Sequence, residues 1–445
     1  MSRPGAAHRS DRLTAPTVDR TEHAATGLAA VFVGLAVPSL IAGRVPIAVL
    51  LGLTGLILAY HWRRRLSLAA LGRGVNTALG RALVAMFTLW LICVFVTIDL
   101  SRSWMVWAST AALVAGGALL TGALRAEPRL LLIAQRTLIV GAIVTGLVAL
   151  VALYIDPATL GLLRIKHIDS ISSAVAALRS TGSVAPCLAA IVLWAGWRMG
   201  GAWRIAGVVF LPIALGTMRG TDSHAGTLGV LAALLALGIA RLFVGLDRRG
   251  RRWLVAGVLT IAVASAAVII SLLPVPPYHE NEALRMPVWL IDAHRQLIWG
   301  FAWHTSLDSP WLGYGLDTAG RVPGAKAFLP GFGKTETMPS HAHNWMLELL
   351  VESGVVGLGA ALVALGVFAR RLLHAARRGA PGAYAAIALA GAYFGSNLVN
   401  FSVWSAWWQA TFLTLLALTL AADPTPGTPS PALRDSAALA PTAAA

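Results

Sequence analysis

The chain has 445 residues, of which 57% are hydrophobic and 12% charged, and its mean hydropathy is +0.73. This composition excludes a water-soluble globule, which is closer to half apolar and a quarter charged, and it also excludes disordered, collagen-like and coiled-coil chains. The formal net charge of +16 does not indicate nucleic-acid binding, because in a membrane protein the distribution of basic residues matters more than their sum.

Apolar segments predict an all-α integral membrane protein with about twelve transmembrane helices. The first nine lie within 23–273 and the last three within 344–422. Residues 1–22 and 423–445 contain too little apolar surface to pack, so we expect disordered cytoplasmic tails there. In chain order the segments lie near 26–43, 45–60, 82–98, 104–123, 137–155, 184–199, 204–218, 226–244, 253–273, 345–369, 382–400 and 403–421.

The basic residues predict the orientation of the chain. Clusters of arginine follow the even-numbered predicted spans, whereas most acidic residues lie in the opposite loops. The positive-inside rule therefore predicts that both termini are cytoplasmic. Residues 274–343 then lie outside, and a connection of about 70 residues is long enough to carry function. Within it, 292–303 is predicted to be an amphipathic helix along the membrane surface, and 310–315 a turn.

Histidine and asparagine mark the outer end of the tenth predicted span, where residues 340–357 have the sequence SHAHNWMLELLVESGVVG. Ser340 or Asn344 is expected to cap the helix. His343 would lie at the water boundary, within reach of a hydrophilic substrate. His341 and His343 resemble a metal-binding pair, but no third ligand has suitable spacing, so we predict no metal site.

Further along this span, a carboxylate and two glycines are unusual for a membrane helix. Glu348 is costly inside a membrane, so it is either functional or a structural partner for a loop arginine. Gly354 and Gly357 are three residues apart and are expected to share a face that a neighbouring helix can approach closely.

The spacing of His343, Asn344, Gly354 and Gly357 resembles the signature of the O-antigen ligase and O-antigen polymerase superfamily of bacterial membrane glycosyltransferases. Upstream, the sequence from Arg295 through Trp299 to the turn with Gly313 and Gly315 is similar to that family's periplasmic "R…W…P-x-x-G-x-G" stretch. The resemblance covers about 180–400. It implies a GT-C-type architecture in the bacterial cytoplasmic (inner) membrane, with residues 274–343 forming a periplasmic catalytic loop.

The resemblance also implies a reaction. A glycan would pass from a polyprenyl diphosphate to the hydroxyl of a glycolipid or glycan acceptor such as lipid A-core, with inversion. His343 would act as base, since the pKa of histidine suits this work. Arg295 would hold the departing diphosphate, because guanidinium groups bind phosphate oxygens in pairs. No metal or other cofactor is then required. Asn344, Glu348, His341 and the four glycines would support the site.

A second diphosphate-binding arginine is expected from the family, at the outer end of the seventh predicted span. Here the family position is occupied by His224, and Arg219 lies five residues earlier. Arg219 is the preferred residue, with His224, when protonated, and Arg285 as alternatives.

Two other functions are consistent with the sequence, a polymerase and a transporter or flippase. An O-antigen or exopolysaccharide polymerase would use the same chemistry on a different acceptor. A transporter or flippase would be expected to show internal repeats and polar residues near the middle of the membrane.

Overall fold

The computed structural model describes residues 20–62, 74–279 and 284–423. In these ranges the chain is helical, and the described part contains no β-strand beyond an isolated bridge between Phe328 and Glu336. The predicted tails, 1–22 and 423–445, lie almost wholly outside the described residues.

Eight of the described helices are long and apolar enough to cross a membrane. Four shorter apolar helices occupy the other predicted segments. The all-helical class is therefore confirmed, whereas twelve crossings and an extracytoplasmic loop stay predictions. The long helices are α4 (Ala78–Phe95), α5 (Leu100–Ala126), α6 (Pro128–Tyr154), α8 (Ile171–Met199), α9 (Gly201–Gly220), α10 (His224–Gly245), α11 (Arg248–Leu272) and α13 (Trp345–Arg377), and the shorter ones are α1 (Arg20–Ala36), α2 (Val45–Trp62), α14 (Ala383–Ser396) and α15 (Ala406–Leu420).

Side-chain caps explain where several helices begin. Thr77, Asp99, Ser170 and Asp247 each accept a hydrogen bond from a backbone N–H three residues later, at the starts of α4, α5, α8 and α11. Such caps satisfy backbone donors that have no partner within the helix. The short polar connections in the sequence thus fix the helix boundaries more sharply than the apolar runs do.

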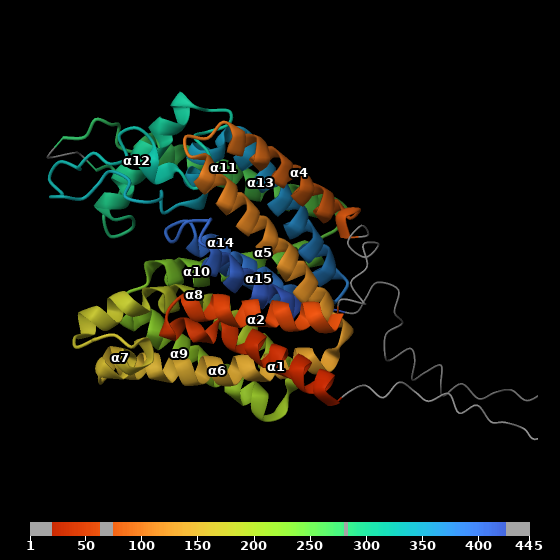
Figure 1. Cartoon of the computed structure of the whole chain (residues 1–445). Helices are drawn as coiled ribbons and strands as arrows, with labels where there is room; N and C mark the ends of the chain where they lie inside the picture. Colours follow the sequence, from red (N-terminus) through yellow and green to blue (C-terminus); the bar gives the residue numbers. More distant parts are fainter. Residues whose placement is uncertain (1–19, 63–73, 280–283, 424–445) are drawn as a thin grey trace, which may run out of the picture.

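The helices form three layers (Figure 1). One layer contains α1, α2, α6, α8 and α9, the middle layer contains α10, α14 and α15, and the third contains α4, α5 and α13. The main core cluster joins the first two layers through residues such as Leu138, Ile191, Leu389 and Trp408. Helix α11 has no buried residue and contacts little besides α10, so it lies at the edge of the bundle.

A separate part is built from residues between α11 and α13. It contains the helix α12 (Ala293–Asp308) and the short helix η2 (Ala319–Arg321), and it has its own apolar cluster. The prediction that 292–303 lies along the membrane surface is wrong, because Leu297 and Ile298 of α12 are buried inside this cluster. Another short helix, α7 (Ala158–Arg164), and the helical turn η1 (Pro38–Ala42) lie at the same end of the bundle.

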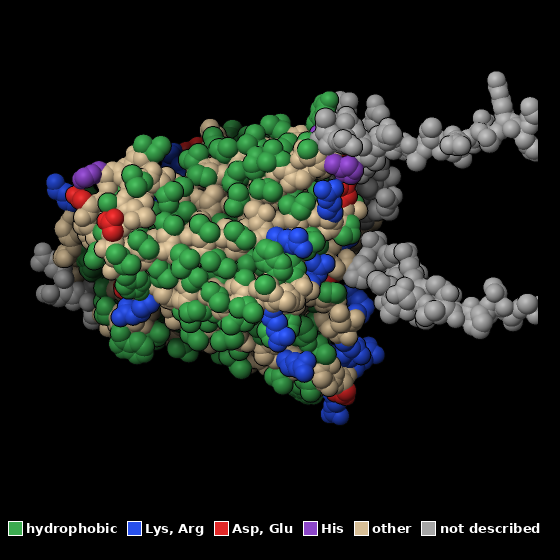
Figure 2. Space-filling model, turned by 90° about the horizontal axis from the view of Figure 1, so that it is seen from below, with side chains coloured by type: hydrophobic (Ala, Val, Ile, Leu, Met, Phe, Trp, Pro, Cys, Tyr) green, Lys and Arg blue, Asp and Glu red, His purple; other side chains and the backbone are tan. Residues whose placement is uncertain are grey.

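Charge is distributed unevenly along the bundle. Figure 2 shows Lys and Arg side chains concentrated at one end of the displayed face, with an apolar belt across its middle. This is the end at which α1 begins and α15 ends, opposite α12 (Figure 1). Basic residues also lie in the end turns of α5, α8 and α13, at Arg125, Arg198 and Arg377. The arrangement is the one that the positive-inside rule associates with a cytoplasmic end.

Candidate functional site

His343 lies just before α13 in a left-handed backbone conformation, with φ of 51°. Its Nδ1 is 2.9 Å from the backbone carbonyl oxygen of Asn400. Because a carbonyl can only accept, Nδ1 carries the proton and donates it, which leaves Nε2 as the nitrogen able to accept a proton. Burial lowers the pKa of His343, the Asn400 hydrogen bond opposes this change, and the charge of Arg295 lowers the pKa further. The ring is therefore neutral at pH 7.

Arg295 lies in the first turn of α12, where Asp292 positions it. The Asp292 carboxylate caps the helix by accepting from the backbone N–H of Arg295 at 3.0 Å, and it also forms an ion pair with the guanidinium. The Nε of Arg295 is buried and has no hydrogen-bond partner. Leaving a buried donor without a partner costs free energy. An anionic ligand that accepted a hydrogen bond from this Nε–H would remove that cost.

A cavity of about 790 Å³ opens beside Arg295, between α10, α11, α12 and α13. Its walls are mostly apolar side chains of α10, α11 and α13, including Leu231, Ile269 and Leu350. Its polar residues gather at one end and comprise Asp292, Arg295, Asn344, Thr227 and His224, with Ser265 on α11. The cavity thus combines an apolar wall with a polar end that contains Arg295 and its ion-pair partner Asp292.

The three residues considered as a second phosphate contact are placed differently. His224 lines the cavity, whereas Arg219 and Arg285 are not among its lining residues. Arg219 is exposed in the last turn of α9. Arg285 is exposed and donates to the backbone carbonyl of Ser271 at 3.4 Å. Of the three, the geometry favours His224, the residue at the family position.

Asn344 is confirmed as the cap of α13, since its side-chain oxygen accepts from the backbone N–H groups of Met346 and Leu347 at 3.0 and 3.2 Å. The His341 ring lies beside that of His343, with centroids 4.1 Å apart. Burial lowers the pKa of His341 to about 3. Trp299, from the resemblance, is buried and donates to the carbonyl of Ala342 at 3.0 Å, which supports the segment leading to His343.

The glycines of the resemblance form an interlock between the turn 310–315 and α13. Gly354 interrupts α13 with φ of 60° and ψ of −168°, a conformation that L side chains rarely adopt. The turn fills the interruption: Tyr314 and Gly315 donate to carbonyls of α13 at 3.0 and 2.8 Å, and Val355 donates back to Pro310 at 2.8 Å.

A side chain at any of these glycines would collide with a neighbour. A Cβ at Gly354 would lie 2.3 Å from backbone atoms of Trp311, and one at Gly313 would lie 2.4 Å from the backbone of Glu352. The expectation that Gly354 and Gly357 face a helix together is therefore wrong for Gly354, which faces the turn. Gly357 does face a helix, since its carbonyl accepts from the indole of Trp90 on α4 at 3.2 Å.

Two buried carboxylates of α13 hold loops in place. Glu348 accepts hydrogen bonds from the hydroxyl of Ser402 and the backbone N–H of Val403. Glu352 accepts from the backbone N–H groups of Asp317 and Ala319, each at 2.9 Å, and from the indole of Trp404. Glu348 is thus a structural anchor, although its partners are a hydroxyl and a backbone amide rather than the loop arginine we considered.

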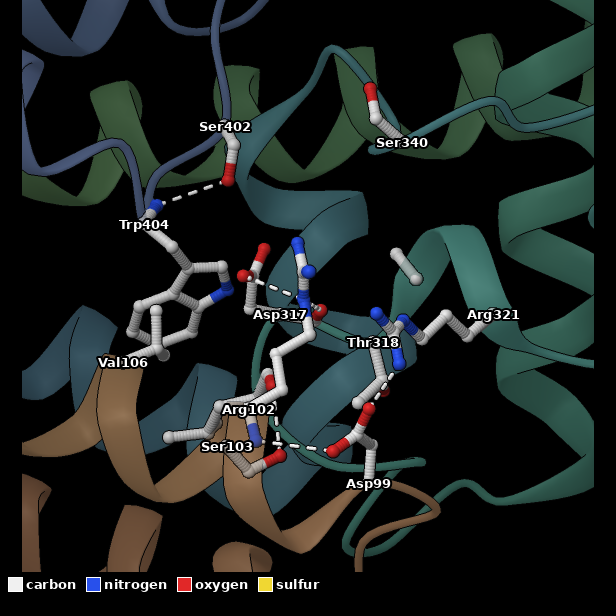
Figure 3. Close-up of polar contacts among 12 residues, drawn as sticks. Asp99, Arg102, Ser103, Val106, Asp317, Thr318, Arg321, Ser340, Ser402 and Trp404 are labelled. Carbon is white, nitrogen blue, oxygen red and sulfur yellow. Dashed lines mark hydrogen bonds and ion pairs between the residues drawn. The ribbon is translucent and has the colours of Figure 1, made fainter.

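The same loop is tied to α5 by ion pairs, as Figure 3 shows. Arg102 of α5 pairs with the carboxylate of Asp317 at 2.9 Å, and Arg321 pairs with Asp99, the cap of α5. Asp317, Glu348 and Glu352 place carboxylate oxygens within 4.8 Å of one another. Their bonds to backbone, hydroxyl, indole and guanidinium donors account for this clustering, so it forms an anchoring network.

Comparison with known proteins identifies the region that carries this site. Residues 213–362 match the family model described as O-Antigen ligase. This part of the chain is similar to the O-antigen ligase superfamily. The matched residues include Arg295, His343 and all the glycines of the interlock. The eight long apolar helices fit a multi-pass membrane protein.

A curated relative adds weaker support. The chain is 25% identical over 130 residues to a protein of Rickettsia conorii named "Putative polysaccharide ligase", a match that covers 28% of this chain. The matching segment spans about a third of that relative's length, 31%.

Proposed function

We propose that the protein transfers a glycan from a polyprenyl diphosphate to the hydroxyl of a glycolipid acceptor, as an O-antigen ligase does, on the extracytoplasmic side of the membrane. One observation carries this proposal: a neutral histidine with a fixed tautomer lies within electrostatic range of an arginine at the polar end of an apolar cavity.

Each part of the donor finds a matching surface. The isoprenoid chain fits the apolar wall formed by α10, α11 and α13, which α11 leaves accessible at the edge of the bundle. The diphosphate fits the polar end, where Arg295 offers a planar guanidinium with an unused Nε–H. His224 would add a second contact, as a hydrogen-bond donor or, when protonated, as a cation. Arg219, which the sequence favoured for this contact, and the alternative Arg285 both lie outside the cavity lining, so we assign the second diphosphate contact to His224.

The reaction requires one proton transfer and one bond exchange. Nε2 of His343 takes the proton of the acceptor hydroxyl as its oxygen attacks the anomeric carbon. The bond from that carbon to the diphosphate oxygen breaks, and both electrons leave with the lipid diphosphate, whose charge Arg295 stabilises. A single displacement of this kind inverts the anomeric centre. The charge on the leaving group is met by guanidinium, so the mechanism needs no metal ion.

Purified full-length protein, supplied with an undecaprenyl-diphosphate glycan, tests the proposal. We expect release of undecaprenyl diphosphate with lipid A-core as acceptor, and no loss of rate with chelator. Release only with a second lipid-linked repeat would indicate a polymerase. Movement of the intact donor between leaflets without cleavage would indicate a flippase, and no release with any acceptor would contradict glycan transfer.

A further inference from the structure

A second apolar cavity, of about 570 Å³, lies between α2, α5 and the start of α15. It shares no lining residue with the cavity beside Arg295. Small residues keep it open: a Cβ added at Gly52 or Gly55 of α2, or at Gly116 of α5, would meet nothing within 4 Å. The cavity is a groove in the apolar surface with no described side chain filling it.

Two arginines without acidic partners lie near the end of this groove at which α2 begins. The guanidinium of Arg44 stacks over the rings of Trp407 and Phe401, at 4.8 and 5.3 Å from their centroids, and Trp407 lines the groove. Arg164 donates from Nε to the carbonyl of Ile41 at 2.9 Å, while its Nη2 is buried without a partner. Among the described residues no carboxylate pairs with either arginine.

The pKa of Arg164 is lowered, first by burial and then by the positive charge of Arg44. The two arginines are therefore close enough to repel each other. Uncompensated like charges are unfavourable unless an anion joins them. The indole Nε1 of Trp407 is also buried without a partner. The same end of the groove therefore presents unused donors and positive charge, which is the chemistry that binds phosphate.

His341 lies between Arg44 and the proposed base in a chain of electrostatic and ring contacts. The charge of Arg44 acts on His341, that of Arg295 acts on His343, and the two rings are adjacent, with centroids 4.1 Å apart. The Nε2 of His341 is buried without a partner. The adjacent histidine rings are thus within electrostatic range of two arginines, Arg44 for His341 and Arg295 for His343.

We propose that the groove between α2, α5 and α15 binds the hydrocarbon chain of a phosphate-bearing membrane lipid, whose phosphate is held by Arg44 and Arg164. Resting on the transfer reaction proposed above, this lipid is the acceptor, which then reaches the histidines from the side opposite to the donor diphosphate.

Lipid binding can be measured without any catalysis. Full-length protein is incubated with dioleoyl phosphatidic acid or dioleoyl phosphatidylcholine, and the lipid that stays bound is counted by native mass spectrometry. We expect preferential retention of phosphatidic acid, reduced about tenfold by Arg44→Gln. Arg204→Gln is the matched control, since Arg204 also stacks on a tryptophan, at 3.5 Å from the ring of Trp197.

A second pair of variants tests the groove itself. Gly116→Leu places a side chain in the open groove, whereas Gly122→Leu adds the same side chain on α5 where a Cβ also meets nothing within 4 Å but outside the groove. We expect only Gly116→Leu to reduce retention of phosphatidic acid. The proposal would be overturned if Arg44→Gln and Gly116→Leu reduced retention of phosphatidic acid no more than their controls do. Equal retention of phosphatidic acid and phosphatidylcholine by the wild type would also overturn it.

The role as acceptor site is tested separately. In the transfer assay we expect Gly116→Leu to raise the KM for the lipid acceptor and to leave the KM for the donor unchanged. A raised donor KM would reverse the assignment. If the wild-type protein binds phosphatidic acid as expected but transfers nothing, the transferase proposal fails while the lipid site stands.

Discussion

Charged residues flank the start of α13 in two groups that differ in how fully they are bonded. In the anchoring network, both oxygens of Glu352 and of Glu348 accept hydrogen bonds, and Asp317 pairs with Arg102. In the candidate site, the Nε of Arg295 has no partner, and the guanidinium lies beside a cavity.

This difference separates structural charges from functional ones. A buried ionic group contributes to a defined structure only when its bonds are complete, since each missing bond leaves a desolvated atom. The network around Glu352 is saturated and leaves nothing for a ligand. The group around Arg295 keeps an unsatisfied donor, which a bound anion would complete, as we propose for the diphosphate. Substitutions in the two groups should therefore affect different quantities.

The largest effect on activity is expected at His343. His343→Gln keeps a side chain that can donate to the carbonyl of Asn400 but removes the basic nitrogen, so the rate should fall by roughly 10²–10⁴-fold, with little change in melting temperature. The measurement is transfer rate beside thermal unfolding in detergent. His294→Gln is the control, because that ring also contacts a backbone carbonyl of the loop, at 3.5 Å. Near-normal transfer by His343→Gln would remove the base assignment.

The opposite result is expected in the anchoring network. Glu352→Gln presents an amide N–H₂ to the donors of Asp317, Ala319 and Trp404, so at least one bond is lost and the loop is destabilised by roughly 1–3 kcal/mol per unsatisfied group. We expect a lower melting temperature, with residual activity in the fraction that remains folded. Unchanged stability with lost transfer would place Glu352 in the reaction instead.

The interlock should respond to a single methyl group. Gly354→Ala forces a side chain into a glycine conformation, at a cost of about 1–3 kcal/mol before the collision with Trp311 is added. Gly366→Ala, in the same helix but in open space, should be neutral or slightly stabilising. Thermal unfolding of both variants measures the difference. Equal melting temperatures of the two variants would show that the close packing of the turn against α13 at Gly354 does not contribute to stability.

Sequence patterns predicted the helices well because hydropathy and helix caps are local. A helix is found in every segment that the apolar runs predicted, and Asn344 was one of the two caps predicted for α13. Motif resemblance located His343 and Arg295, which the fold brings within electrostatic range of each other. The glycines were recognised by spacing, but their interlock depends on a pairing between residues about forty positions apart, which no local pattern encodes.

Long-range partners were the part that sequence could not supply. The fixed tautomer of His343 depends on the backbone of Asn400, and any residue at that position would provide the same carbonyl. Arg44 was overlooked, although one signal was available: it is the charged residue between the first two apolar runs, on the side where the positive-inside rule disfavours cations.

Arg295→Lys tests whether the guanidinium binds two oxygens of the diphosphate at once. Lysine keeps the charge but loses the planar fork, so we expect turnover to fall about 10–10²-fold, close to the effect of Arg295→Ala. Arg285→Lys is the matched control, since Arg285 is exposed and lies outside the cavity lining. The initial rate at saturating donor measures the effect. A mild phenotype for the lysine variant would show that charge alone suffices.

The smallest expected effect is a shift in pH dependence. Burial and the charge of Arg295 hold the pKa of His343 below its usual 6.5, and only the neutral ring can accept a proton. The kcat/KM of the wild type should therefore stay constant as the pH falls from 7 to 6.5, and should decrease only at lower pH. Arg295→Gln removes a positive charge that disfavours protonation, so the pKa should rise and the acid limb should move toward higher pH, whereas Arg204→Gln should leave it in place. An unmoved limb in Arg295→Gln would mean that the two groups do not act on one another during turnover, and the distinction between open and saturated charges would then rest on stability alone.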